Sequence, residues 1–95
     1  MSSYVDAQEL EGFINKDVVL DTRGAILYLG KLGRVLDHFY ELVDADVHDV
    51  VEGRTSKELY VMEARKHGVK KNRKSVFVRK AEIISISRLE DVIEY

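Results

Sequence analysis

The chain has 95 residues, of which 45% are hydrophobic, and these values predict a single compact domain over residues 1–95. It contains no cysteine, which excludes disulfides and thiolate metal sites, so we expect self-association to support the small core. The net charge of −2 argues against general attraction to nucleic acid. No apolar segment approaches the roughly 18 residues of a membrane span, so we expect a cytoplasmic protein without membrane contact.

The first predicted element is a short amphipathic helix over residues 6–14. Asp6 and Glu9 have the spacing of a capping box, and apolar side chains then recur at helical spacing. Residues 17–22, DVVLDT, predict a strand that ends at an Arg-Gly turn.

A β-rich tract follows over residues 25–36. It contains Gly30 and Gly33, which a sharply bent strand would need, because the bend leaves no room for side chains on its inner face. Residues 41–50 alternate apolar and polar side chains, as in a half-buried strand. Two further strands are predicted over residues 75–80 and 83–89.

A helical insertion separates the third and fourth predicted strands. Thr55 and Glu58 form a second capping box and Gly68 ends the pattern, which predicts a helix over 55–67. The basic loop 65–74, RKHGVKKNRK, holds six Lys and Arg, which leaves nine basic against 17 acidic residues elsewhere. We interpret it as a solvated loop, with a phosphate-contacting arm as the alternative. The candidate phosphate contacts are Lys70, Lys71, Arg73 and Lys74.

Three polar side chains share one face of the third predicted strand: Asp44, Asp46 and His48. They could bind a divalent cation, but no further histidine or cysteine is placed to complete the coordination, so we favour a polar exterior face. We expect no metal and no cofactor. The sequence has no glycine-rich phosphate loop and no Ser-His-Asp arrangement, so we predict that the protein is not an enzyme.

The order of elements predicts a mainly β fold, in which an N-terminal helix precedes a small, strongly bent, five-stranded antiparallel barrel. Residues 76–86, VFVRKAEIISI, resemble the second motif of the Sm and Sm-like (LSm) proteins, which has an apolar-aromatic-apolar triplet followed by Arg-Gly. Arg79 matches the motif arginine, and Lys80 replaces the glycine. Gly30 matches the glycine of the first motif. The chain thus resembles a divergent member of this family over roughly residues 5–93.

The resemblance implies a ring of six or seven subunits, in which the fourth strand of one subunit pairs with the fifth strand of the next. In the family, single-stranded RNA threads the inner rim of the ring. Each base lies between a stacking residue and the motif arginine, while an asparagine reads the edge of the base. The resemblance therefore predicts a ring-forming homo-oligomer that binds single-stranded RNA in a ribonucleoprotein or RNA-chaperone assembly. The alternative is an Sm-fold scaffold or protein-interaction module that has lost the RNA site.

The first motif can be aligned with the segment DHFYEL, residues 37–42, in two ways. Without a gap, His38 takes the stacking position and Tyr40 replaces the asparagine. We prefer this alignment because it places Phe39 and Val43 at apolar core positions.

With one inserted residue, Asp37 matches the aspartate of the motif, Phe39 takes the stacking position and Glu41 replaces the asparagine. A glutamate accepts hydrogen bonds from donors, which suits the edge of guanine better than that of uracil. The two alignments together give the candidate RNA-binding residues His38, Phe39, Tyr40, Glu41, Arg79 and Lys80.

Overall fold

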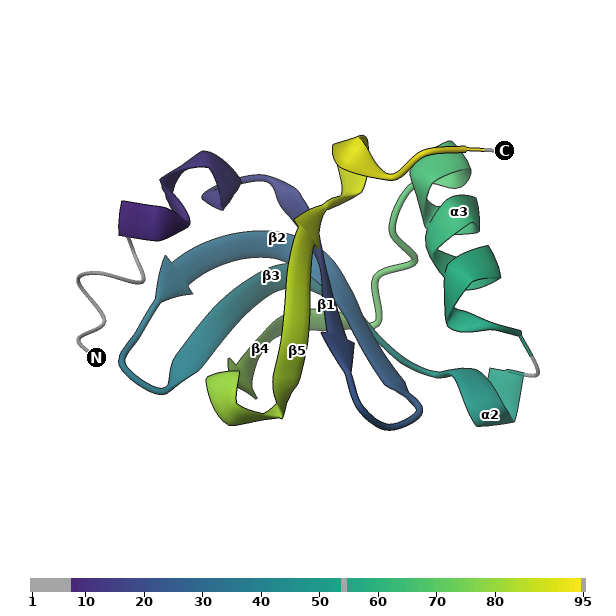
Figure 1. Cartoon of the computed structure of the whole chain (residues 1–95), viewed down its shortest axis with the longest axis horizontal. Helices are drawn as coiled ribbons and strands as arrows, with labels where there is room; N and C mark the ends of the chain where they lie inside the picture. Colours follow the sequence, from purple (N-terminus) through teal and green to yellow (C-terminus); the bar gives the residue numbers. More distant parts are fainter. Residues whose placement is uncertain (1–7, 54, 95) are drawn as a thin grey trace.

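The computed structural model describes residues 8–53 and 55–94, which form a five-stranded antiparallel sheet of order β4-β3-β2-β1-β5 (Figure 1). The strands are β1 (Asp17–Thr22), β2 (Ile26–Val35), β3 (Phe39–Asp49), β4 (Arg73–Arg79) and β5 (Ile83–Arg88). The predicted mainly β class and its five strands are confirmed, although β3 begins two residues before its predicted start. In the sheet, β4 and β5 are the two edge strands.

Two helices, α2 (Val50–Gly53) and α3 (Lys57–His67), lie between β3 and β4 and confirm the predicted insertion. The predicted cap is wrong by one residue, because the hydroxyl of Ser56, and not that of Thr55, accepts the Leu59 N–H at 3.1 Å. Within the described ranges no helix has the length and apolar character needed to cross a membrane.

The predicted N-terminal helix over 6–14 is not seen. Its first two residues lie outside the described residues, and the described part has a 3-10 turn, η1 (Glu11–Phe13). Beyond η1 the chain is extended at Ile14, which bridges to Leu32 of β2, and the Asn15 N–H donates to the Leu32 carbonyl at 2.7 Å. Pairing with the sheet therefore overrides the local helical pattern.

The two faces of the sheet are buried by different partners. The inner face holds a core cluster that consists of Val18, Leu20, Leu32, Leu42, Ala45 and Val78. On the outer face, α3 and the turn η3 (Leu89–Asp91) cover Val19 of β1 and Leu27 and Leu29 of β2. Both faces of β1 are therefore buried, which explains its unbroken apolar run, VVL. On the outer face beside β3 and β4, Phe39 and Phe77 remain exposed.

The predicted role of Gly30 is confirmed by the space around it. A Cβ atom added there would lie 3.0 Å from the Ala45 Cα and 3.1 Å from its Cβ, and the φ of Gly30 is 157°. The register between β2 and β3 shifts at this point. Only glycine allows β3 to approach β2 so closely where the sheet bends.

The trio of Asp44, Asp46 and His48 does not form the predicted polar exterior face. Asp44 has a φ of 51°, and beyond it the strand alternates in the opposite sense, so that Asp44 is exposed and Asp46 is only 2% exposed. The hydroxyl of Tyr60 donates to Asp46 Oδ2, and the Asn72 amide donates to Asp46 Oδ1 at 3.0 Å. Through these hydrogen bonds, Asp46 links α3 and the loop that follows it to β3.

The Tyr60 hydroxyl gives this contact a pH dependence. Burial, reinforced by the hydrogen bond to Asp46, raises the pKa of Tyr60 well above its ordinary value of 10.0. The folded chain keeps the proton to higher pH than the unfolded chain, so the free energy of unfolding falls as the pH rises above 10. Tyr60→Phe should cost about 1–2 kcal/mol at pH 7, and its difference from the wild type should narrow above pH 10. Urea unfolding at several pH values measures this.

Tyr28→Phe is the matched control, because the Tyr28 ring packs against the inner core, on the other face of the sheet from Tyr60. We expect this variant to keep the alkaline loss of stability. A wild type and a Tyr60→Phe variant that lose stability in parallel above pH 10 would contradict the assignment.

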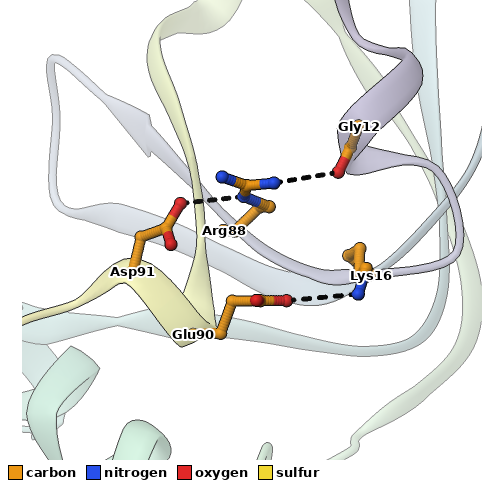
Figure 2. A network of polar contacts seen from close by, with 5 residues as sticks. All are labelled: Gly12, Lys16, Arg88, Glu90 and Asp91. Carbon is orange, nitrogen blue, oxygen red and sulfur yellow. Dashed lines mark hydrogen bonds and ion pairs between the residues drawn. The ribbon is translucent and has the colours of Figure 1, made fainter.

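A polar network joins the N-terminal turn to the C-terminal segment (Figure 2). The Arg88 guanidinium donates to Asp91 Oδ2 at 2.8 Å and to the Gly12 carbonyl at 3.4 Å, and Lys16 lies 3.4 Å from Glu90. Arg88 also lies over the Phe13 ring, 5.5 Å from its centroid. These contacts hold η3 in place at the end of β5.

Candidate nucleic-acid interface

The structure brings together the two predicted halves of the RNA site. His38 lies in the turn between β2 and β3, and its carbonyl accepts the Lys80 N–H at 2.9 Å. In the register of β3 and β4, Phe39 lies directly opposite Arg79. Because partners across antiparallel strands point to the same face, the Phe39 ring and the Arg79 guanidinium share the outer face of the sheet.

The reason for preferring the ungapped alignment is wrong. Phe39 is 36% exposed and Val43 is half-buried, while Leu42 is fully buried in the inner core and Tyr40 packs against it. The outward residues of this segment are Phe39 and Glu41, which the gapped alignment assigns to stacking and to base reading. Tyr40 is turned to the inner face, with the Lys80 ammonium 5.6 Å from its ring centroid.

A second aromatic ring extends this surface. Phe77, opposite Glu41 in the register, is 50% exposed and meets Phe39 edge to face, with ring centroids 6.4 Å apart. The Arg34 guanidinium lies 5.9 Å from the Phe77 centroid. The outer face at this end therefore presents aromatic and guanidinium planes side by side, and both kinds of plane can stack on nucleobases.

Arg34 also lies on this surface, although the sequence did not single it out. Its Nε donates to Glu41 Oε1 at 2.9 Å and its Nη2 to Oε2 at 3.2 Å, a bidentate pair. The hydrogen bond to Arg34 lowers the pKa of Glu41, so the carboxylate stays ionised. The available signal was the position of Arg34 and Glu41 on either side of the predicted turn between two antiparallel strands.

Gly33 provides room for this pair. A Cβ atom at residue 33 would lie 2.8 Å from Glu41 Oε1, and the register between β2 and β3 shifts between Leu32 and Val35. Both oxygens of Glu41 are held by one guanidinium, so Glu41 accepts a hydrogen bond from a base only through its remaining lone pairs.

The basic loop 65–74 is shorter than predicted and is not a free arm. α3 continues to His67 and β4 begins at Arg73. Asn72 is pinned to β3, since its N–H donates to the Ala45 carbonyl at 2.8 Å and its side chain bonds the backbone of Val47.

The candidate phosphate contacts lie at the far end of β4 from Arg79. Arg73 and Arg79 are six residues apart in an extended strand, or about 20 Å at roughly 3.3 Å per residue. Lys71 lies 3.8 Å from Asp44, while Lys70 and Lys74 are exposed. The structure therefore separates the candidate stacking residues from the basic segment. One strand of RNA would have to cross the length of β4 to meet both.

In the part of the chain that the structure describes, no group of three or more His, Cys, Asp or Glu side chains could hold a metal ion. His48 instead stacks on Tyr60, with ring centroids 3.6 Å apart and planes 8° apart.

No family model matches the sequence, and no curated protein matches it. Among solved structures, the chain is similar to the Sm protein of Pyrococcus abyssii, which was solved in complex with a uridine heptamer. The match has a TM-score of 0.55 and 16% sequence identity, and it covers 85% of this chain and 93% of the archaeal one. The chain therefore has the Sm fold, as the resemblance of its motifs predicted.

Proposed function

We propose that the protein is an Sm-like subunit that binds single-stranded RNA by stacking bases on the outer face formed by Phe39 and Arg79. The observation that carries the proposal is the pairing of these two residues across β3 and β4, within an Sm fold. The two residues come from segments far apart in the sequence. The second motif predicted Arg79, and the gapped alignment of the first motif predicted Phe39 as the stacking residue. A similar protein with this fold was solved with bound uridine RNA, which supports RNA as the ligand class.

The other candidate residues have different roles in this proposal. His38 is exposed in the turn beside Phe39 and supplies a second surface for stacking or a hydrogen bond to the sugar-phosphate backbone. Tyr40 and Lys80 contact each other, so they shape the rim of the site and do not read a base. Glu41 orients the Arg34 guanidinium and balances its charge, so Arg34 contributes the flat face of its guanidinium and no net positive charge.

A ring completes the proposal, because a single chain leaves both edges of the sheet open. The edge strands β4 and β5 would pair between neighbouring subunits, which satisfies backbone groups that otherwise face solvent. Phe77 of β4 and Ile84 of β5 are large apolar side chains exposed on these edges. We propose a homo-oligomeric ring of six or seven subunits.

Substitution of the stacking residues tests the RNA site. Phe39→Ala and Arg79→Ala should each weaken binding to a short oligouridine by about 5- to 150-fold, which corresponds to about 1–3 kcal/mol for one stacked base. Fluorescence anisotropy at two salt concentrations measures the affinities. Because the stacking contribution of Phe39 is not ionic, its loss should persist at the higher salt.

Arg23→Ala is a matched control for Arg79→Ala, because Arg23 is an exposed arginine in the turn between β1 and β2. It should change the affinity less than twofold. RNA binding that survives both Phe39→Ala and Arg79→Ala, and is lost on removal of the lysines at 70 and 71, would place the RNA on the basic loop instead.

An Sm-fold scaffold without RNA is the second candidate. Two observations favour it: Tyr40 packs against the inner core, and both oxygens of Glu41 bond to Arg34. Neither residue is therefore placed to read a base as the asparagine of the family does. A purified oligomer that binds none of oligouridine, oligoadenosine and a guanosine-containing strand would support the scaffold. A preference for guanosine that disappears in Glu41→Gln would instead assign base reading to Glu41.

A further inference from the structure

A groove of about 550 Å³ runs along the outer side of the open edge strand β5. Its floor is formed by Val19 of β1 with Ser85 and Ser87 of β5. The walls are Val61 and Met62 of α3 and, after η3, Ile93 of the C-terminal segment. The groove thus exists because the inserted helix and the C-terminal segment both extend past the covered part of the sheet.

We propose that this groove receives the Phe77 side chain of a second copy of the chain, so that Phe77 belongs to the subunit contact and base stacking is left to Phe39 and Arg79. The inference rests on the proposed ring and extends it, because it assigns to α3 and the C-terminal segment the role of a socket for the next subunit. Strand pairing alone would require neither element.

Side-chain alternation sets which residues can meet. On β5, Ile83 and Ile86 pack on the inner core while Ser85 and Ser87 line the outer groove. On β4, Phe77 lies on the outer face, opposite Glu41. We consider antiparallel pairing of β5 with β4 of a second copy, with the two strands fully overlapped and their outer faces on the same side. This register places Ser85 opposite Phe77 of the second copy. The Phe77 ring then lies directly at the mouth of the groove.

The apolar part of the groove matches the Phe77 ring, while the rest of its lining carries charged side chains, among them the ion pair of Asp21 and Lys57. Phe77 is half exposed in the single chain, and Ile93 in the wall of the groove is 72% exposed. Serine side chains on the floor leave space next to β5, which an incoming phenyl ring fills. Burial of an aromatic ring against Val61, Met62 and Ile93 supplies the hydrophobic contribution that a short strand pair lacks.

One ion pair is available in the same antiparallel arrangement. Arg73 of β4 would lie beside the segment that follows β5, where Glu94 carries a negative charge. Lys74 would lie opposite Arg88, whose charge is balanced by Asp91 within its own chain. In a pair of copies this heterologous contact leaves one socket and one Phe77 unused. Further copies can therefore add at both ends until a ring closes.

The polar network of Figure 2 joins η3, which precedes Ile93 in the chain, to the N-terminal turn. Arg88, which ends β5, donates to Asp91 and to the Gly12 carbonyl. These contacts order the start of the C-terminal segment, which lowers the ordering cost of association.

Sedimentation of variants tests the socket. Phe77→Ala and Ile93→Glu should each raise the dissociation constant between subunits at least tenfold, because one removes the ring and the other places a charge in its socket. Ile93 is exposed, so the fold of the single chain should tolerate this substitution. Leu59→Glu is the matched control, since Leu59 is an exposed apolar residue of α3 that does not line this groove. It should change the constant less than twofold.

Cross-linking locates the contact directly, because the chain contains no cysteine. Two differently tagged chains, one with Phe77→Cys and one with Met62→Cys, are expressed together and treated with a short bis-maleimide. A covalent dimer carrying both tags is expected. Replacement of Met62→Cys by Leu59→Cys should reduce the yield at least fivefold.

The outcomes separate the socket from the ring and from RNA binding. A wild-type chain that is monomeric at every concentration overturns both the ring and the socket. An oligomer that is unaffected by Ile93→Glu and gives no link between residues 77 and 62 overturns the socket alone. Loss of RNA binding in an intact, cross-linkable oligomer removes the RNA site and leaves the socket standing.

Discussion

Gly30→Val is expected to lower the free energy of unfolding by about 3 kcal/mol or to prevent folding. A Cβ atom at this position would lie 3.0 Å from the Ala45 Cα and 3.3 Å from the Val43 carbonyl oxygen, so the clash is with backbone that cannot turn away. The φ of 157° adds strain for a β-branched side chain. The chain has no tryptophan, so far-UV circular dichroism in urea is the suitable measurement.

Gly24→Ala is the control for this substitution. No atom lies within 4 Å of a Cβ added at Gly24, so the free energy of unfolding should stay within about 0.5 kcal/mol of the wild type. If Gly30→Val were folded and within 1 kcal/mol of the wild type, β2 and β3 could not approach each other as described. All variants must be compared at one protein concentration, because self-association adds to the apparent stability.

Asp46→Ala should lower the free energy of unfolding by about 3 kcal/mol and release α3 from the sheet. The substitution removes the acceptor for the Tyr60 hydroxyl and the Asn72 amide, and hydrogen bonds to a charged group contribute about 1.5–3 kcal/mol each. Hydrogen exchange should show the loss of protection mainly in α3 and the loop before β4. The proposed Phe77 socket includes α3, so the proposed subunit association should weaken as well.

Asp44→Asn tests whether the loss of stability is specific to Asp46 or follows the removal of any acidic charge from β3. Asp44 is exposed, its contact with Lys71 is 3.8 Å long, and asparagine tolerates its φ of 51°. We expect a change within about 0.5 kcal/mol. Equal losses in the two variants would mean that Asp46 does not hold the insertion.

The two candidate RNA segments could be predicted because their motifs are local. Arg79 follows an apolar-aromatic-apolar triplet, and the segment 38–41 follows the bend glycine at a fixed interval, so the Sm resemblance could be read from short stretches. The face of the sheet on which each of these side chains lies could not be predicted. Phe39 lies outside and Tyr40 inside, because β3 is in register with β4 from its first residue onward. The two alignments differ by one residue, and a shift of one residue exchanges the two faces of the sheet.

Asp46 and Arg34 show a second limit of the same kind. Alternation placed Asp46 in water, but the left-handed backbone at Asp44 reverses the alternation, and an aromatic residue of the insertion closes over the carboxylate. Arg34 bonds Glu41 from within the register shift between Leu32 and Val35, which sequence alternation does not predict. Bulges of this kind change the orientation of the side chains that follow, and no residue type marks them reliably.

The sequence by itself determined the mainly β class, the five strands, the helical insertion and the bend at Gly30, because each depends on periodicity or on the absence of a side chain. The tertiary structure decided the conformation of residues 8–14, the burial of Asp46, and the exposure of Phe39 and Phe77. It also decided that β5 has a groove beside it. These features depend on contacts between residues distant in the chain, and the free energy of such contacts exceeds the small local preferences that a sequence pattern expresses.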